Sequence, residues 1–446
     1  MKLPEKGTSH EELLAEMRAL QDGDADWRNG KIFSLVYFAG DDVAELLKET
    51  YAAFIYTNGL SVAAFPSLRK FESEVLAMTA ALLGSSEAAG NMTSGGTESI
   101  LMAIKTARDW ARAQRPEVRE PEMVLPVTAH PAFEKAAHYF DVKPVHIPIG
   151  DDFRADVAAA REAITDNTIL IVGSAPCYPY GTVDPIPALA ALAQERGICC
   201  HVDACVGGFL LPFLPRLGYK VPPWDFSVPG VTSISADLHK YGYTARGSST
   251  VMYRSKELRR YQFFSYADWP GGLYGSPTMA GSRPGGAIAA AWALMNYLGE
   301  EGYARLVGSS METARELIDG VNAIPGLHVL GKPDTSVFSF TSDTVDIFAV
   351  GDEMDKRGWH LDRQQMPPKL HMVVTFAHQG IGPQFLADLE ESTRSIASEG
   401  PTPGGSAAMY GALGTMPDRG SVERVIRDFL DSSTEPREDP QPAEKP

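Results

Sequence analysis

Apolar positions alternate between a helical period and short continuous runs over residues 56–320. In the segment ESILMAIKTARDWARAQ (98–114), Ile100, Ile104 and Trp110 recur at helical spacing on one face. Compact apolar runs rich in β-branched residues separate such helical segments: MVLPV (123–127), TILIVGSAP (168–176), ICCHVDA (198–204), VTSISAD (231–237) and STVMY (249–253). Strands that are apolar on both sides are typical of a parallel sheet covered by helices. The pattern therefore predicts a large α/β domain with a mostly parallel sheet.

The segments on either side of this region carry different patterns. Residues 1–55 form an N-terminal extension with two amphipathic helices, and residues 321–432 alternate strand and helix patterns typical of a small α+β domain. Residues 433–446 are polar and proline-rich, which predicts a disordered tail. The predicted elements are helices at 11–20, 43–54, 346–358 and 382–398 and strands at 337–342 and 370–378.

Composition narrows the possible classes of function. The 57 acidic against 40 basic side chains give a formal charge of −17, which argues against nucleic acid or an anionic membrane as the main partner. No apolar run reaches the ~18 residues of a membrane-spanning helix, and the charged N-terminus lacks the apolar core of a signal peptide. Reduced, buried thiols and a cytoplasmic location are predicted from the clustering of the cysteines, which are Cys177, Cys199, Cys200 and Cys205.

A glycine-rich turn, TSGGTES (93–99), stands where a strand pattern gives way to a helix. Gly95 and Gly96 let the backbone approach a ligand closely, and Thr97, Ser99 and the free N–H groups of the helix start form an anion site. Taken alone, the turn is also explained as an ordinary helix cap.

Three further candidates stand at strand ends, which face the ligand crevice of an α/β sheet. His130 can stack there on a flat ring. Asp203 is a buried carboxylate, costly unless it meets a cation such as a protonated pyridine nitrogen. Lys240, preceded by His239, is predicted to have a lowered pKa and to act as an amine nucleophile. Singly, these are also explained as a structural histidine, a capping aspartate and a surface His-Lys pair.

The four features occur in chain order on one α/β scaffold, each where a sheet delivers it to one crevice. Together they supply an anion cup, a stacking group, a partner for a ring nitrogen and an amine, which are the contacts that pyridoxal 5′-phosphate (PLP) requires. The signatures GxxxxGK[ST], HExxH and GxSxG are absent from the sequence. No metal site is predicted, because metal-ligand spacing is not shown by His138, His146, His360, His371 and His378.

Longer motifs are similar to those of fold-type I PLP enzymes of the group II decarboxylase branch. TSGGTESILMA, HVDACVGGF, SISADLHKYGY, RRYQFF and YGSPTMAGSRPGG resemble the soluble bacterial sphingosine-1-phosphate lyases of that branch, from about Val36 to Tyr410. The resemblance implies an aldehyde-lyase that cleaves the C2–C3 bond of a phosphorylated sphingoid base to a long-chain aldehyde and ethanolamine phosphate. It also implies an obligate homodimer with shared active sites, to which residues 1–55 contribute.

The resemblance assigns roles to individual residues. Lys240 is implied to hold PLP as a Schiff base, Asp203 to bind the pyridine nitrogen and His130 to stack on the ring. The other implied cofactor contacts are Gly95, Gly96, Thr97 and His239, with Ser276 and Thr278 from a neighbouring subunit. The implied catalytic residues are Lys240, Tyr178, His239 and Tyr410, and the implied substrate contacts are Tyr37, Asn58, Ser61, Arg246 and Arg283.

Three positions depart from the family pattern. Ser61 in NGLS stands where the family reads NPLH, Arg246 in TARGSS replaces a lysine, and Tyr180 replaces the histidine of PHG. The arginine keeps the charge, but proton transfer by that residue is not expected. The three departures leave the implied cofactor contacts unchanged. They affect the positions expected to recognise the substrate phosphate.

The base that removes the proton of the substrate 3-hydroxyl stays open among Lys240, Tyr178 and Tyr410. The aromatic stretch YQFFSYADW (261–269) is interpreted either as the wall of an apolar channel or as ordinary core. Two alternatives to the lyase are amino-acid α-decarboxylation, because SGGTE also occurs in tyrosine and aspartate decarboxylases, and a non-catalytic scaffold with a PLP fold.

Overall fold

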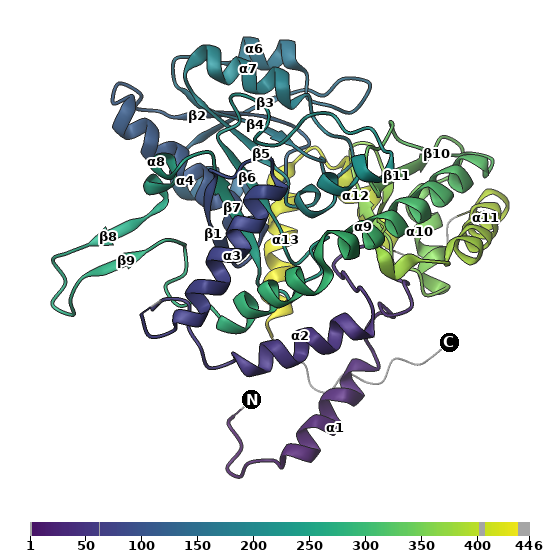
Figure 1. The fold of residues 1–446 in the computed structure, drawn as a ribbon. Helices are drawn as coiled ribbons and strands as arrows, with labels where there is room; N and C mark the ends of the chain where they lie inside the picture. The colour runs from purple at the N-terminus through teal and green to yellow at the C-terminus, as the bar shows by residue number, and fades with distance from the viewer. Residues whose placement is uncertain (1, 62, 401–405, 436–446) are drawn as a thin grey trace.

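A seven-stranded sheet with the strand order β1-β7-β6-β5-β4-β2-β3 forms the centre of the computed structural model, which describes residues 2–61, 63–400 and 406–435 (Figure 1). Its strands are β1 (Ala89–Thr93), β2 (Glu122–Pro126), β3 (Lys143–Ile147), β4 (Thr168–Ser174), β5 (Cys199–Asp203), β6 (Ser233–Ala236) and β7 (Ser249–Tyr253). All neighbours run parallel except β7, which pairs antiparallel with β1 and β6. The predicted mostly parallel sheet is confirmed.

Helices cover both faces of this sheet. The helices that precede β10 in the chain are α1 (His10–Gln21), α2 (Asp41–Ala53), α3 (Pro66–Leu82), α4 (Gly96–Gln114), α5 (Ala132–Phe140), α6 (Val157–Ala163), α7 (Ile186–Arg196), α8 (Lys256–Arg259) and α9 (Gly285–Ala323). Of these, α1 buries no residue and α2 packs on α9, so neither covers the sheet directly. Alternate strand residues face opposite sides: Val124 packs in the core with α7 and α9, whereas Met123 and Leu125 pack against α4 and α5. Burial on both faces explains why the strands are continuously apolar.

A second packed unit follows the long helix α9, which bends at Gly299, where φ is 55°. Its four-stranded antiparallel sheet has the order β10-β11-β13-β12. The elements are β10 (Leu327–Val329), β11 (Val337–Ser342), α10 (Ile347–Lys356), β12 (Asp362–Gln364), β13 (Lys369–Val373), α11 (Gly382–Glu399), α12 (Ser406–Thr415) and α13 (Arg419–Ser433). The fold is thus the predicted large α/β unit with a smaller α+β unit. The predicted boundary at residue 320 falls inside α9.

The N-terminal extension is tied into the second unit. Phe33 is fully buried in its core, and the N–H of Phe33 donates to the His360 carbonyl while the N–H of Val373 donates to the Phe33 carbonyl. His378 stacks on the Phe33 ring at 4.5 Å. The extension therefore packs into the second unit at Phe33.

A two-stranded hairpin, β8 (Phe264–Tyr266) and β9 (Tyr274–Ser276), projects from the molecule (Figure 1). Phe264, Tyr266 and Trp269 are each about half exposed. Within this chain, the exposed side chains of the stretch 261–269 are therefore not core, whereas its interpretation as a channel wall stays a prediction.

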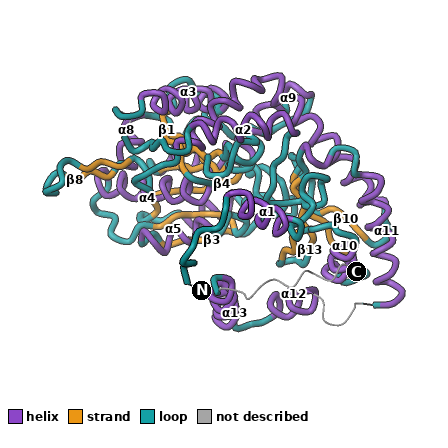
Figure 2. The backbone as a smooth tube through the Cα atoms, turned by 90° about the horizontal axis from the view of Figure 1, so that it is seen from below, coloured by secondary structure: helices purple, strands orange, loops and turns teal. Residues whose placement is uncertain are grey.

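The C-terminal helices and the tail complete the description. Helices α12 and α13, which no sequence pattern above predicted, lie at the margin of the molecule in Figure 2. Of the predicted tail 433–446, residues 436–446 lie outside the described residues. Within the described part of the chain, no helix is long and apolar enough to cross a membrane.

Candidate active site

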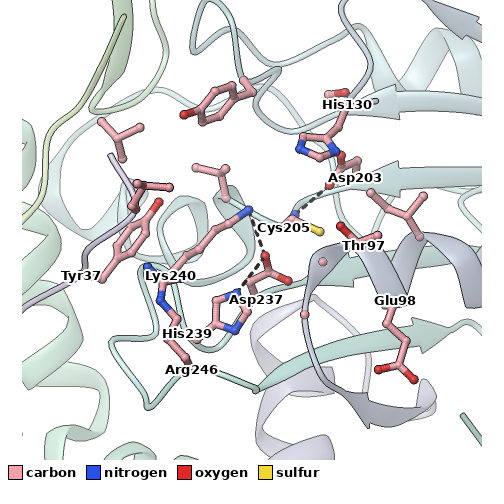
Figure 3. A pocket seen from close by; sticks show the side chains of 18 of the residues that line it. Tyr37, Thr97, Glu98, His130, Asp203, Cys205, Asp237, His239, Lys240 and Arg246 are labelled. Carbon is pink, nitrogen blue, oxygen red and sulfur yellow. Dashed lines mark hydrogen bonds and ion pairs between the residues drawn. The ribbon is translucent and has the colours of Figure 1, made fainter. Parts of the chain in front are cut away.

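A cavity of about 640 Å³ opens at the carboxyl ends of β4, β5 and β6, beside the start of α4. This is the edge at which open α/β sheets bind their ligands. The cavity brings together every cofactor contact that the motifs predicted for the chain's own site, which are Gly95, Gly96, Thr97, His130, Asp203, His239 and Lys240. Figure 3 shows Tyr37 and Lys240 on one side of the cavity and His130 with Asp203 on the other.

The turn between β1 and α4 forms a cup for an anion. A Cβ atom at Gly96 would lie 2.8 Å from both Asp237 Oδ2 and Cys205 Sγ, so only glycine fits this approach. Glu98 shapes the turn from behind, because its Oε2 accepts from the N–H and the hydroxyl of Ser94 at 2.7 and 2.6 Å. The first N–H groups of α4 and the positive end of its dipole are left for a phosphate.

Ser99 does not belong to this cup. Its hydroxyl is fully buried and shares hydrogen bonds with Thr93 (2.6 Å) and Ser249 (2.8 Å), which join α4 to the sheet. The expectation that Ser99 binds the anion is wrong, because its hydrogen-bonding groups are satisfied inside the protein.

Asp203 and His130 suit a flat, protonated ring. Asp203 ends β5 and is 8% exposed; its Oδ1 accepts from the Cys205 N–H at 3.0 Å, and it forms no ion pair with any residue that the structure describes. A buried carboxylate without a cation fits a pyridinium nitrogen. Burial lowers the pKa of His130, and its Nδ1 accepts from the Ala132 N–H at 3.1 Å, so the ring is neutral.

Lys240 makes an ion pair that the sequence did not suggest. Its Nζ lies 2.9 Å from Oδ2 of Asp237, which is 1% exposed (Figure 3). Burial alone would lower the pKa of Lys240, but the charges of Asp237, Cys205 and Tyr37 outweigh it and raise the pKa. The predicted lowered pKa is therefore wrong for the protein without its cofactor, in which the amine is a cation held by a carboxylate.

Asp237 stands in the motif SISADLHKYGY, three residues before Lys240, but the sequence pattern did not mark it as a site residue. Burial would raise its pKa, but the charges of Lys240 and His239 lower it, and His239 Nε2 lies 3.7 Å from Oδ2. The available signal was a carboxylate at a strand end, one turn before the lysine. Cys205, in the motif HVDACVGGF, also lines the cavity without having been predicted.

Three predicted residues line the other end of the cavity. Tyr37 is partly buried, and its removal from water raises its pKa to about 12; the Arg246 guanidinium lies 5.6 Å from its ring centroid. Tyr178 also faces the cavity, and its hydroxyl donates to Asp362 Oδ2 at 3.0 Å.

Other predicted substrate contacts lie away from this cavity. Arg283 is 10% exposed and its Nη2 donates to Glu72 Oε2 at 2.9 Å, in a buried ion pair. Asn58 Nδ2 donates to the Ser282 hydroxyl at 3.0 Å, and Ser61 is exposed. Within one chain, none of these three side chains reaches the cavity.

The residues expected to work across subunits also lie elsewhere. Ser276 and Thr278 are buried at the base of the β8–β9 hairpin, where their hydroxyls donate to backbone carbonyls of the same segment. Tyr410, implied to be catalytic, also lies outside the cavity, in α12, 5.9 Å from the Phe348 ring. Tyr180, the departure from the family pattern, packs 4.2 Å from the Phe153 ring. The predicted roles of Ser276, Thr278 and Tyr410 stay predictions.

The histidines expected to be structural have ordinary partners. His146 lies 2.8 Å from Glu134, and His378 Nε2 donates to the Ile32 carbonyl at 2.9 Å. Among the described residues, no group of three or more His, Cys, Asp or Glu side chains could hold a metal ion.

Comparisons with known proteins agree with this geometry. The family model of the pyridoxal-dependent decarboxylase conserved domain matches residues 1–342. The sphingosine-1-phosphate lyase of Arabidopsis thaliana is 49% identical over 96% of this chain and 80% of its own length. The rat enzyme of that name, from Rattus norvegicus, is 43% identical over 97% of this chain and 77% of its own length.

Solved structures give the same picture. A sphingosine-1-phosphate lyase of Burkholderia pseudomallei has a TM-score of 0.90 and 40% identity, over 98% of both chains. A glutamate decarboxylase of Lactobacillus brevis has a TM-score of 0.78 at 21% identity, over 89% of this chain and 95% of its own, and shows the shared fold alone. Fold, cavity and family model define a PLP enzyme of the pyridoxal-dependent decarboxylase class. Within that class, the chain belongs to the sphingosine-1-phosphate lyase family.

Proposed function

We propose that the protein is a PLP-dependent lyase that cleaves the C2–C3 bond of phosphorylated long-chain 2-amino-3-hydroxy bases. The products are a long-chain aldehyde and ethanolamine phosphate. The observation that carries this proposal is one cavity that holds an anion cup, a neutral histidine, a lysine and a strand-end carboxylate without an ion pair among the described residues, in a chain 49% identical to a sphingosine-1-phosphate lyase.

Each residue at the cofactor end has a separate role. When bound, PLP supplies an aldehyde for the amines and a ring that accepts the electron pair of a bond broken beside the substrate amino group. The α4 N–H groups beside Gly95 and Gly96 hold the phosphate, Asp203 holds the ring nitrogen, and Lys240 is the amine that the substrate amine displaces. Asp237 takes up the positive charge of Lys240 whenever that amine is free and protonated.

The substrate end offers one cation and an apolar margin. Arg246 faces the cavity beside Tyr37 and is the group we assign to the substrate phosphate. Leu35, which is 72% exposed although it lines the cavity, and Val373 offer apolar surface to a hydrocarbon chain. Ser61 and Arg283 take no part within one chain.

A homodimer is part of the proposal. Ser276 and Thr278 lie outside their own chain's cavity, at the base of a hairpin whose aromatic side chains are exposed. Such a projecting apolar hairpin suits burial against a second copy. Light scattering after gel filtration tests this: the expected mass is twice 48.3 kDa, and a monomer that turns over substrate contradicts the dimer.

We also propose a cytoplasmic location. All four cysteines are free and buried, and burial raises the pKa of Cys177 to about 11. Unpaired thiols of this kind suit a reducing compartment. Fractionation of the source cells, followed by detection of the protein, tests the location.

Product identification tests the function directly. The purified, PLP-loaded protein is incubated with sphinganine phosphate, and ethanolamine phosphate and the long-chain aldehyde are measured by mass spectrometry. In parallel, carbon dioxide release is measured from tyrosine, aspartate and glutamate. Aldehyde formation supports the proposal, whereas carbon dioxide without aldehyde overturns it in favour of α-decarboxylation.

A further inference from the structure

A carboxylate outside the predicted site holds the hydroxyl of Tyr178. Asp362 begins β12 in the second unit, and its Oδ2 accepts from the Tyr178 hydroxyl at 3.0 Å. Its other oxygen, Oδ1, accepts from the Ser34 hydroxyl at 2.9 Å. Ser34 directly precedes Leu35, which lines the cavity. Three distant segments of the chain thus meet at this carboxylate, at the substrate end of the cavity.

His371 fixes the position of the tyrosine from the other side. Its ring centroid lies 4.2 Å from that of Tyr178, and its Nε2 donates to the Tyr178 carbonyl at 2.7 Å. Because Nε2 carries the hydrogen, Nδ1 is a bare acceptor that lies 3.9 Å from Asp362 Oδ2. Burial lowers the pKa of His371 to about 4, so the imidazole is neutral. Among the described residues, no lysine or arginine forms an ion pair with Asp362, and His371 is the nearest basic side chain that the ion pairs give it.

We propose that Asp362 is a positioning residue that makes Tyr178 the base for the substrate 3-hydroxyl. The proposal rests on the lyase function and selects among the three bases that the sequence left open. Lys240 is paired with Asp237, and Tyr410 packs beside Phe348 rather than in the cavity. Tyr178 lines the cavity while its hydrogen is directed to Asp362, which leaves the lone pairs of its oxygen to accept a proton.

The proton transfer balances within these groups. The O–H bond of the substrate 3-hydroxyl breaks, and Tyr178 Oη gains that proton as its own proton passes to Asp362 Oδ2. The O–H electron pair becomes the second bond of the aldehyde carbonyl, while the C2–C3 pair goes to the electron acceptor named above. Tyr178 stays neutral overall, and Asp362 becomes a carboxylic acid. The Asp362 side chain is 38% exposed, so it can then return the proton to water.

Three variants test the relay in steady-state turnover of sphinganine phosphate. In Asp362→Asn, the side chain still accepts from Tyr178 but cannot take its proton, so kcat falls about 100-fold. KM stays within about threefold of the wild-type value, because substrate contacts are unchanged. Tyr178→Phe lowers kcat at least as far, and the double variant is no slower than Tyr178→Phe alone, since both changes remove one relay. Additive losses in the double variant, or a wild-type kcat for Asp362→Asn, overturn the proposal.

A control and a second measurement separate this result from misfolding and from failure of the lyase assignment. Asp343→Asn removes a carboxylate that is 84% exposed, and its kcat is expected to match the wild type. Burial first, and then the charge of Asp362 and its hydrogen bond, raise the pKa of Tyr178. Carbon-13 NMR of labelled tyrosine in cofactor-free protein, with the signal assigned by its loss in Tyr178→Phe, reports that pKa. Asp362→Asn lowers it; an unchanged pKa overturns the proposal. If the wild-type protein shows no turnover, the lyase function is contradicted instead. The NMR result then tests the Tyr178–Asp362 contact by itself.

Discussion

The two ends of the cavity are built in different ways. At the cofactor end, Gly95, His130, Asp203 and Lys240 each follow a strand of the large sheet, so one sheet edge places them all. At the substrate end, the Tyr178–Asp362 hydrogen bond joins the large unit to the second sheet across 184 residues, and Ser34 adds the N-terminal extension. A single rigid sheet thus defines the first end, whereas the second depends on how three segments pack.

The difference between the two ends indicates where the enzyme tolerates substitutions. Residues at the ends of parallel strands converge because the backbone ladder holds them, whatever the neighbouring loops do. Residues from separate units converge only while the packing between the units holds. We therefore expect changes at the cofactor end to cause the largest losses of turnover, and changes at the substrate end to cause smaller changes in rate or stability.

The largest effect is expected at Lys240. Lys240→Ala removes the amine that we propose to link the cofactor, so turnover falls to background and borohydride no longer traps bound PLP. Absorbance spectra before and after borohydride, together with an aldehyde assay, measure both effects. Lys48→Ala, at a side chain that is 66% exposed, serves as the control and keeps both signals. A Lys240→Ala protein with full turnover contradicts the assignment.

Asp203→Asn comes next. The variant removes the carboxylate that we propose to bind the ring nitrogen, so kcat is expected to fall about 10²- to 10³-fold while the protein still binds PLP. Turnover and cofactor content are measured on the same sample. Ser235→Ala removes only the 3.3 Å hydrogen bond to Asp203 Oδ1 and is expected to lose far less activity. Equal losses in the two variants would assign Asp203 a packing role.

Arg283→Met tests the substrate contact that the structure does not support. Leaving Glu72 buried without its partner is expected to lower the free energy of unfolding by about 3–5 kcal/mol, with KM nearly unchanged. Urea unfolding and steady-state kinetics measure the two quantities. The double variant Glu72→Gln/Arg283→Met should recover part of the stability. A raised KM with wild-type stability would show that Arg283 contacts the substrate.

The contact between the extension and the second unit predicts a pH dependence. Burial lowers the pKa of His378 from 6.5 to about 4, and its Nδ1 accepts from the Thr375 N–H at 2.8 Å. Below pH 6.5, His378 takes up a proton in the unfolded chain, whereas in the folded chain it stays neutral until the pH approaches about 4. The corresponding stability is therefore present above pH 6.5 and is lost as the pH falls toward 4, by up to about 3 kcal/mol. Urea unfolding at several pH values should show a flatter acid slope for His378→Gln; an identical slope rules this out.

Ser61→Ala is expected to have the smallest effect on stability and on KM. Ser61 is exposed and lies outside the cavity of its own chain, so stability should change by less than about 0.5 kcal/mol and KM by less than about twofold. Thermal unfolding and steady-state kinetics check this. A large rise in KM would show that Ser61 reaches the cavity of a second subunit.

Much of the fold and of the cofactor end could be predicted from residue order alone. The apolar runs that became β2, β4, β5, β6 and β7 were found because strands covered on both faces must be continuously apolar. The hairpin strands β8 and β9 and the helices α12 and α13 were missed, since their apolar side chains are largely exposed and do not follow a core pattern. Their aromatic and aliphatic residues gave a misleading signal of burial.

By itself, the sequence determined the identity and order of the groups that we propose to hold PLP, because a strand end carries its residue to one sheet edge whatever the rest of the chain does. Tertiary structure alone decided which charges and hydroxyls meet. It paired Lys240 with Asp237, so that the pKa of the lysine is raised rather than lowered. It also paired Arg283 with Glu72 and Tyr178 with Asp362, across 211 and 184 residues. The physical reason is that electrostatic and hydrogen-bond energies depend on separations of a few ångströms, and only the packed chain sets those distances.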